Sequence, residues 1–462
     1  MGEDIGQGAL RRYGGQPMSF GTASGSGSPS SGISSSGRFG SLSVEADLER
    51  RRRDACPSAH VPFAAADGAL LRVRVPGGRL AAADLRAVAD AAAHSDNSII
   101  ELTNRANLQL RGYAAGPAQT ALDGLIAAGL VRPDLDEDAR RNVIGSPLAG
   151  IDAEALDTKP VVDAIDAILM THTAPLSPKF GVIVDGGGTI HLRGRRHDLV
   201  FGAAELDGQT VFEIALGDAL AIGRSIAATS LVVEPAAAAR VVAAVLALLQ
   251  PGERGGELTK RIGRSGVVGA LTAVAGCRVV ASDAITRPTE PAAIPIGRGS
   301  GWVAGAPSLG RTNTDGMRAL ADLAEQLGAH EVRITPWRSV VVPLRSDADA
   351  AAAEARLVAI GMCTDVRQPA VSVIACAGSS GCTAGEADTQ ADARTLIDLL
   401  GSAPQSRTIH LSGCPKRCAS RSANMLTLVA AGGLYDVYDG TDRIADALSP
   451  TAALALASGG TI

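Results

Sequence analysis

The chain has 462 residues, of which 46% are hydrophobic, 20% charged and 3% aromatic, and its formal net charge is −5. This length predicts about two to four domains, with cores built mainly from Ala, Val and Leu. The acidic balance argues against a nucleic-acid-binding protein, which usually carries a basic excess. No apolar run reaches the roughly 20 residues of a membrane helix, so neither nucleic acid nor a membrane is an expected partner.

Cysteine usage indicates the cellular compartment. The sequence contains seven cysteines, and its start does not read as a secretory signal. An odd number of cysteines without such a signal favours metal or redox chemistry over a disulfide framework. We therefore expect a cytoplasmic protein.

The first 54 residues differ in composition from the rest. They are rich in Gly and Ser and end in the cationic run Arg50–Arg53. Such a stretch buries too little apolar surface to offset the entropy of ordering it. Residues 1–54 are therefore predicted to be a disordered tail, and the arginine run a solvated one.

A repeat follows the tail. The stretch "LRAVADAA" begins at Leu85, and "MRALADLA" begins 232 positions later at Met317. Each copy reads as an amphipathic helix followed by a β-rich stretch, "SIIELTNRANLQLRGY" in the first and "HEVRITPWRSVVVPL" in the second. The repeat predicts two related α+β half-domains, over 55–115 and 299–345, around a pseudo-twofold axis.

Each half-domain is followed by an α/β stretch. Residues 116–298 alternate helix-like segments such as "ALDGLIAAGL" with strand-like ones such as "KFGVIVDGGGTIHL". Residues 346–462 form a shorter version, with strands at "AVSVIAC" and "RTIHLSGC" and a helix at "ADARTLIDLL". The glycine-rich "GRGSGWVAG" is predicted to be a turn, so no nucleotide site is expected.

Four cysteines of the last unit have ligand spacing. Cys376 and Cys382 flank "AGSSG", and Cys414 and Cys418 flank "PKR". Each pair follows a predicted strand, so the four thiols are expected at one sheet edge. A long loop of small residues suits a 4Fe-4S cluster better than zinc, although zinc or plain buried cysteines stay as alternatives. Buried apolar thiols are predicted for the other three, Cys56, Cys277 and Cys363.

The C-x5-C and "GCPKRCA" motifs resemble those of the sulfite and nitrite reductases, and the resemblance covers nearly everything after residue 55. It implies an α+β and α/β fold in which a ferredoxin-like half-domain is duplicated and paired with α/β domains of the sirohaem and 4Fe-4S type. It also implies that Cys376, Cys382, Cys414 and Cys418 hold a 4Fe-4S cluster. In family members with sirohaem, the last of these cysteines also bridges to its iron.

Three basic motifs extend the resemblance. It implies a substrate-binding role for four cations: Arg105 and Arg111 in "LTNRANLQLRG", Arg141 in "RRNVIGSP" and Lys179 in "LSPKFGVIVD". The planar fork of arginine suits carboxylates. Four further arginines could add to this store of donors or be exposed surface residues, namely Arg140, Arg193, Arg195 and Arg196.

One position departs from the family pattern. Sulfite reductases carry a second lysine two positions after the first, and this chain has Gly181. Losing that cation weakens the field for a sulfite dianion. The chain instead resembles the oxygen-dependent branch of the family, which hydroxylates precorrin-3A at C20 and closes a γ-lactone on the aerobic route to cobalamin. Sirohaem-dependent nitrite or sulfite reduction and a non-catalytic tetrapyrrole carrier stay as alternatives.

This branch implies precorrin-3A and dioxygen as substrates, an external donor (a ferredoxin or an NADH-dependent reductase), and no sirohaem. A cluster held by four cysteines has no open position for dioxygen. A mononuclear non-haem iron is therefore kept as a second candidate cofactor, and the catalytic residues are unknown. Its candidate ligands are His172, His191, His197 and His410, which lack the spacing of a facial triad and could each be structural.

Overall fold

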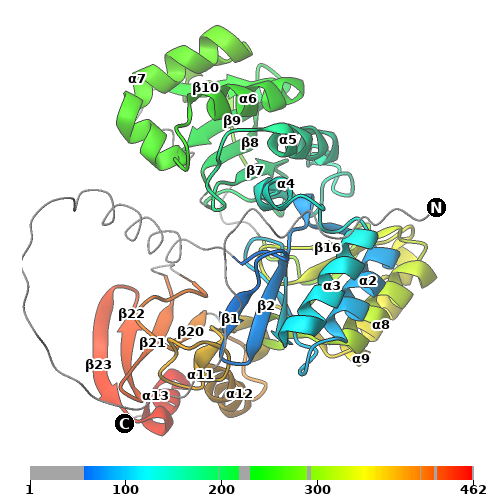
Figure 1. The fold of residues 1–462 in the computed structure, drawn as a ribbon, viewed down its shortest axis with the longest axis vertical. Coiled ribbons are helices and arrows are strands. Elements are labelled where there is room, and N and C mark those ends of the chain that lie inside the picture. The colour runs from blue at the N-terminus through cyan, green and yellow to red at the C-terminus, as the bar shows by residue number, and fades with distance from the viewer. Residues whose placement is uncertain are drawn as a thin grey trace, which may run out of the picture. The chain divides into compact units, whose positions relative to one another are not determined.

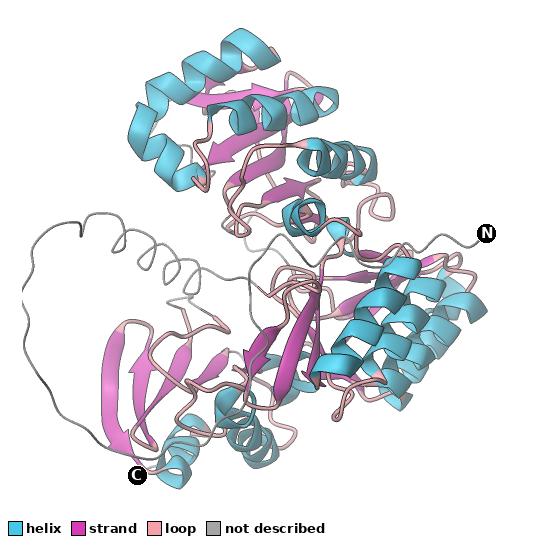
Figure 2. Ribbon diagram, in the orientation of Figure 1, coloured by secondary structure: helices cyan, strands magenta, loops and turns pink. Residues whose placement is uncertain are grey.

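The computed structural model describes residues 57–195, 197–217, 229–288, 293–405, 407–420 and 424–459. The predicted tail over 1–54, Cys56 and Arg196 lie outside the described residues. The chain from residue 56 onward forms one compact unit. The strands of its described residues form four sheets, and the helices pack on their faces (Figures 1 and 2).

The two ferredoxin-like half-domains exchange strands. The first sheet has the order β1 (Phe63–Ala65), β2 (Gly68–Val73), β5 (Leu108–Tyr113), β4 (Ile100–Leu102) and β15 (Arg311–Thr312). The second has the order β13 (Gly297–Gly299), β14 (Trp302–Pro307), β17 (Val340–Pro343), β16 (Glu331–Ile334) and β3 (Arg79–Ala81), with β18 (Met362–Cys363) beside β14. Each sheet is thus completed by a strand from the other repeat. The stretch predicted as a turn, residues 297–305, forms a hairpin: it includes β13 and the start of the antiparallel strand β14, and the chain turns between them at residues 300–301.

The duplication extends to single hydrogen bonds in the turns after β4 and β16. The N–H of Thr103 donates to the Asn107 carbonyl at 2.9 Å, and the N–H of Thr335 donates to the Ser339 carbonyl at 2.9 Å. Ala106 and Arg338 occupy equivalent positions, and both have left-handed backbone, with φ of 55° and 59°. The predicted pseudo-twofold duplication is confirmed.

The repeated helices form a layer over these sheets. α2 (Ala82–Ala92) packs against α8 (Thr314–Gln326), and α3 (Ala115–Ala127) lies beside α2 (Figure 1). α9 (Ala350–Ala359) follows the second repeat. The apolar stripe of α2 recurs every three or four residues and is fully buried, as at Leu85, Val88 and Ala89. Small alanines let the two helices approach closely.

The middle domain is a seven-stranded mixed sheet. Strands β6 (Val143–Gly145), β7 (Val182–Asp185) and β8 (Leu199–Leu206) are parallel, and the antiparallel part contains β9 (Gln209–Leu216), β10 (Thr229–Val233), β11 (Arg278–Ala281) and β12 (Ile285–Thr286). The domain also contains the helices α4 (Leu135–Arg140), α5 (Lys159–Thr171), α6 (Ala238–Leu248) and α7 (Gly255–Ala275). Strand β7 is buried along its whole length, as expected for a central strand.

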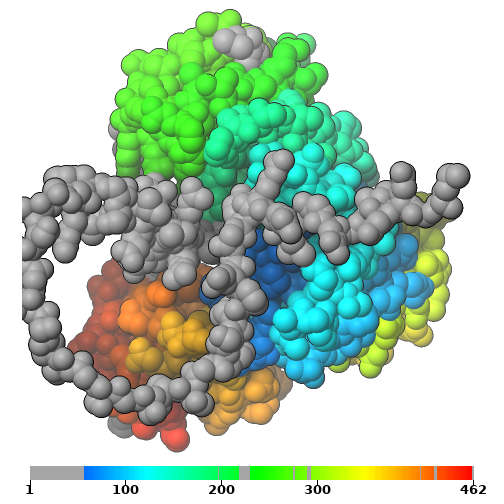
Figure 3. Space-filling view, viewed as in Figure 1, coloured from blue at the N-terminus to red at the C-terminus, as the bar shows by residue number. Residues whose placement is uncertain are grey.

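The C-terminal domain carries the four cysteines. Its sheet has the order β19 (Val373–Ala375), β20 (Ile409–Ser412), β21 (Leu426–Ala431), β22 (Leu434–Asp439) and β23 (Asp442–Leu448). The first three strands are parallel, and the domain's helices are α10 (Pro369–Ser372), α11 (Gly378–Gly381), α12 (Thr389–Leu400) and α13 (Pro450–Ala457). Figure 3 shows this domain, in orange and red, adjoining the first half-domain in blue. None of the described helices is long and apolar enough to cross a membrane.

Candidate functional site

The topology brings the two cysteine loops to one edge of the C-terminal sheet. Strands β19 and β20 are parallel neighbours, so their carboxyl ends meet. Cys376 follows β19 directly, and its N–H donates to the Leu411 carbonyl at 3.1 Å. Cys382 follows the short helix α11, while Cys414 and Cys418 lie on the turn after β20.

Glycines let these loops approach each other. The N–H of Gly413 donates to Sγ of Cys376 at 3.1 Å. A Cβ at Gly413 would lie 3.5 Å from that sulfur and 3.3 Å from Cα of Gly378. Gly378 itself has a φ of +64°, and a Cβ there would lie 2.6 Å from the backbone nitrogen of Thr389. The loops therefore form a narrow cradle whose backbone N–H groups can reach sulfur.

Ligation by all four thiols stays a prediction. In the part of the chain that the structure describes, no three His, Cys, Asp or Glu side chains form a group that could hold a single metal ion. The four candidate histidines therefore form no such group there either. Of the remaining thiols, Cys277 is buried, which raises its pKa to about 11, and Cys363 is half-buried.

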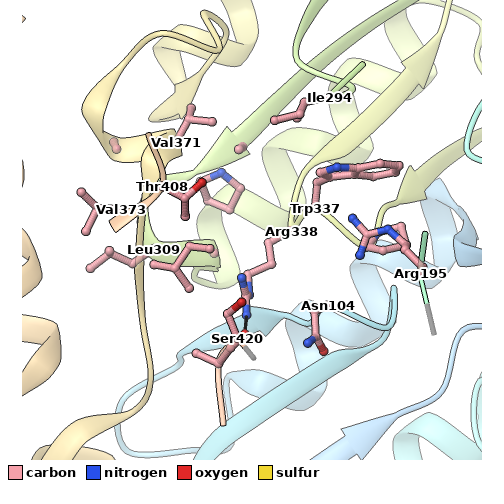
Figure 4. A pocket seen from close by; sticks show the side chains of 17 residues that line it. Asn104, Arg195, Ile294, Leu309, Trp337, Arg338, Val371, Val373, Thr408 and Ser420 are labelled. Carbon is pink, nitrogen blue, oxygen red and sulfur yellow. Dashed lines mark hydrogen bonds between the residues drawn. The ribbon is translucent and has the colours of Figure 1, made fainter. Parts of the chain in front are cut away.

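A cavity lies beside the turn that carries Cys418. It is lined by the two half-domains, the middle domain and the C-terminal domain, and Figure 4 shows its side chains. Its polar and aromatic lining includes Asn104, Arg195, Trp337, Arg338, Thr408 and Ser420. Ala419 and Ser420, directly after Cys418, therefore join the cysteine turn to the cavity wall.

Two arginines of this cavity are held in defined positions. The Arg195 guanidinium lies over the Trp337 ring, 4.2 Å from its centroid. Burial and the nearby charge of Arg338 lower the pKa of Arg195 to about 10. Nη2 of Arg338 donates to the Ala419 carbonyl at 2.7 Å, and burial lowers the pKa of Arg338 also. Trp337 and Arg338 were not predicted as site residues.

The signal for Arg338 was present in the repeat. The equivalent position of the first half-domain is Ala106, so the turn itself needs only a small residue. An arginine with left-handed backbone is an unusual choice there. Aligning the two repeats residue by residue would have singled it out.

Three of the predicted cations are neutralised inside the protein. Arg111 donates to both carboxylate oxygens of Asp67, at 2.8 and 2.9 Å, and to the Gly381 carbonyl. Nε of Arg141 lies 3.3 Å from Oδ2 of Asp166. Nη1 of Arg193 lies 3.4 Å from a carboxylate oxygen of Glu213.

The other predicted cations have different surroundings. The side chain of Arg105 is half-buried and has no hydrogen bond or ion pair with a described residue. Lys179 is half-buried, and its backbone N–H donates to Oγ of Ser177 at 3.4 Å. Arg140 donates to the Met170 carbonyl at 3.5 Å. None of Arg105, Arg111, Arg141 and Lys179 lines the cavity beside Cys418, and their substrate-binding role stays a prediction.

Gly181 lies against the imidazole of His197. A Cβ at Gly181 would lie 2.4 Å from Cε1 of His197, too close for any side chain unless the ring moves. Burial, together with the charges of Arg105 and Arg254, lowers the pKa of His197 to about 3. The neutral imidazole of His197 therefore occupies the space beside Gly181, the residue that departs from the family pattern.

His410 is a second neutral imidazole, on β20. It is 0% exposed, and neither ring nitrogen has a hydrogen-bond partner among the described residues. Burial, with the charges of Arg338 and Arg417, lowers its pKa to about 4. Along β20 its side chain alternates with Ile409 and Leu411, which belong to the domain core, so His410 lies on the opposite face of the sheet.

The chain is similar to a known protein family and to several known proteins. The family model described as Nitrite/Sulfite reductase ferredoxin-like half domain matches residues 64–128 and 297–360. A precorrin-3B synthase from Sinorhizobium sp. is 30% identical over 403 residues, which cover 83% of this chain and 82% of the relative.

Two further proteins support the same assignment of fold. A ferredoxin–nitrite reductase from Synechococcus elongatus is 26% identical over 396 residues, covering 78% of this chain and 76% of the relative. The structure of the Mycobacterium tuberculosis NirA protein superposes with a TM-score of 0.65 at 21% identity, covering 82% and 76% of the two chains. At that identity the superposition shows a shared fold.

Proposed function

Since this chain belongs to the nitrite/sulfite reductase family, we propose that it is a precorrin-3B synthase. In this reaction dioxygen hydroxylates precorrin-3A at C20 and a γ-lactone closes. One oxygen atom enters the product, the other leaves as water, and two electrons come from an external donor. The observation that carries the proposal is the contact between the cysteine turn and the cationic cavity, where Ala419 accepts from Arg338 at 2.7 Å.

Thiol donors on two neighbouring loops, and a backbone N–H that donates to one of the sulfurs, support a cluster at the cysteine edge. Cys376, Cys382, Cys414 and Cys418 would hold the 4Fe-4S cluster, with Gly413 donating to the sulfur of Cys376. A Cβ at Gly413 would fill the approach between the two loops. When bound, the cluster would supply one-electron transfer from a ferredoxin or an NADH-dependent reductase.

The residues of the cavity would bind and orient the ring. Arg195 and Arg338 offer planar donors for its carboxylates, and Trp337 offers an aromatic surface. The neighbouring wall contains apolar side chains, including Leu309 and Val373, that exclude water from part of the ring. The substrate edge would thus lie beside the turn that follows Cys418.

Sirohaem-dependent reduction of nitrite or sulfite is a second candidate. Its support is the similarity to a ferredoxin–nitrite reductase. The packing of His197 on Gly181 counts against sulfite, because it leaves no room for a cation at that position. The two candidates differ in what the purified protein absorbs and in what it oxidises or reduces.

Labelled dioxygen separates these functions. The purified protein is incubated anaerobically with precorrin-3A and a reductant, and ¹⁸O₂ is then admitted. Mass spectrometry should find one labelled oxygen atom in the ring product. Sirohaem absorption together with nitrite turnover would support the second candidate, and binding of precorrin-3A without label would indicate a carrier. Either result would contradict the proposal.

A further inference from the structure

We propose that Arg195 and Arg338 form a clamp for one carboxylate of the bound ligand, with Asn104 beside them. This carboxylate clamp rests on the proposed function only for the identity of the ring that carries the carboxylate. Figure 4 shows both guanidinium groups at the cavity, with Asn104 between them in this view. Neither arginine belongs to the cysteine motifs or to the three basic motifs, although Arg338 lies within the residues 297–360 that match the family model.

The first argument is unneutralised charge. Arg111, Arg141 and Arg193 each have a carboxylate within 3.4 Å. Arg195 and Arg338 have no carboxylate partner among the described residues; Arg195 lies on Trp337, and Arg338 donates to the Ala419 carbonyl. The described lining of the cavity therefore contains two arginines and no carboxylate, although the charge of Glu101 acts on Arg338 from outside that lining.

The second argument is electrostatic. The two guanidinium groups lie close enough that Arg338 contributes to the lowered pKa of Arg195, and burial lowers the pKa of both. Arginine side chains stay protonated in proteins at neutral pH, so both carry a charge. Two partly buried like charges destabilise each other until an anion enters between them. His410, the buried imidazole near Arg338, is neutral and cannot supply that charge.

The third argument is preorganisation. The aromatic face of Trp337 orients Arg195. The backbone of Arg338 is fixed by the turn in which its N–H donates to the Thr335 carbonyl at 3.0 Å. Donors that are ordered before binding lose less entropy when a ligand arrives. Because the same turn in the first half-domain has Ala106, the fold does not require the arginine.

The lining indicates the class of ligand. Arginine forks pair with carboxylates in bidentate geometry. The same cavity contains Leu309, Val371 and Ile374, which a small inorganic anion would leave in contact with water. The lining therefore suits a molecule that has both apolar surface and carboxylates, such as a tetrapyrrole polyacid.

Binding of a commercial porphyrin polyacid tests the clamp without turnover. Uroporphyrin III, with eight carboxylates, is titrated by calorimetry into the full chain as purified, and its octamethyl ester serves as the uncharged probe. Arg195→Gln and Arg338→Asn should each weaken uroporphyrin binding about tenfold to a hundredfold, as expected for a lost charge-assisted hydrogen bond. Asn is chosen at 338 because it tolerates left-handed backbone.

Two controls keep the test specific. Arg298, an arginine paired with Glu354 and 53% exposed in its side chain, gives the control Arg298→Gln, which should bind uroporphyrin like the wild type. Arg195→Lys should restore part of the affinity, because it keeps the charge but not the fork. Circular dichroism confirms that each variant is folded.

The outcomes are separable from those of the labelling experiment. Undetectable binding of uroporphyrin to the wild type, unchanged affinity in both variants, or equal losses for the acid and the ester would each overturn the clamp. If both variants lose affinity for the acid alone while no labelled product forms, the clamp stands and the proposed reaction fails.

Discussion

Arg111 of the first half-domain contacts the loop that carries Cys382. Its side chain is 3% exposed and forms two hydrogen bonds to Asp67, at 2.8 and 2.9 Å. Nη1 lies 3.4 Å from Glu101, and Nη2 also donates to the Gly381 carbonyl, one residue before Cys382. Arg111→Gln removes all of these contacts at once.

The structure sets the size of the expected effect. Removing one partner of a buried ion pair costs about 3 to 5 kcal/mol, because the remaining charge stays buried. Two features favour the lower end of this range. The Asp67 side chain is 17% exposed, and Glu101 keeps an ion pair with Arg311 at 2.6 Å. We therefore expect Arg111→Gln to lower the free energy of unfolding by about 3 kcal/mol.

The assay combines stability with reactivity. Urea unfolding followed by circular dichroism gives the stability, and iodoacetamide labelling mapped by mass spectrometry gives the native alkylation rate of Cys382 in metal-free protein. We expect faster alkylation in Arg111→Gln, because the loop loses its contact at Gly381. Arg111→Lys should lose roughly half as much stability, since it keeps the charge but not the two-pronged geometry.

Arg86→Gln is the matched control. Arg86 also pairs with two carboxylates, Asp322 and Glu325, but on the exposed surface of the helix layer. Surface pairs contribute little to stability, so no resolvable change is expected. The reasoning is refuted if Arg111→Gln unfolds like the control, or if it is destabilised while Cys382 reacts no faster than in the wild type.

Two further predictions concern the neutral histidines. His410→Leu should stabilise the chain more at pH 5 than at pH 7.5, by about 2 kcal/mol. The reason is that the histidine of the unfolded chain takes up a proton below pH 6.5, whereas the folded one, with a pKa near 4, does not. A difference in the free energy of urea unfolding that does not depend on pH would contradict this. Gly181→Ala should cost about 1 to 3 kcal/mol through overpacking on His197. The double variant with His197→Ala should recover most of that loss in a double-mutant cycle, and additive losses would show that His197 is not the obstacle.

Local patterns predicted the elements and the cysteine edge well. The periodic apolar positions of α2, such as Leu85 and Val88, specify its buried face before any partner is known. The two cysteine pairs follow strands that are parallel neighbours, so their meeting follows from the order of elements alone. The first inference needs only residues that are close in sequence, whereas the second also uses the general rule that consecutive strands joined by a helix pair in parallel.

Local sequence patterns do not predict which strands or side chains pair when they lie far apart in the sequence. The pairing of Leu80 with Val332 exchanges strands between repeats, and neither segment shows it locally. The sequence likewise shows many arginines but not which of them meet a carboxylate. Arg111 was predicted to bind substrate, yet Asp67, 44 positions away, engages two of its donor groups. Which cations stay available for a ligand is decided by the tertiary fold.

Each of the two half-domains contacts one of the cysteine loops through an arginine. Arg111 of the first half-domain donates to the carbonyl before Cys382, and Arg338 of the second donates to the carbonyl after Cys418. These arginines are not at equivalent positions of the repeat, so the two contacts are not related by the pseudo-twofold axis. One arginine is neutralised by Asp67, whereas the other has no carboxylate partner among the described residues. The duplicated scaffold thus holds one loop by a structural ion pair and leaves the charge beside the other available for an anion.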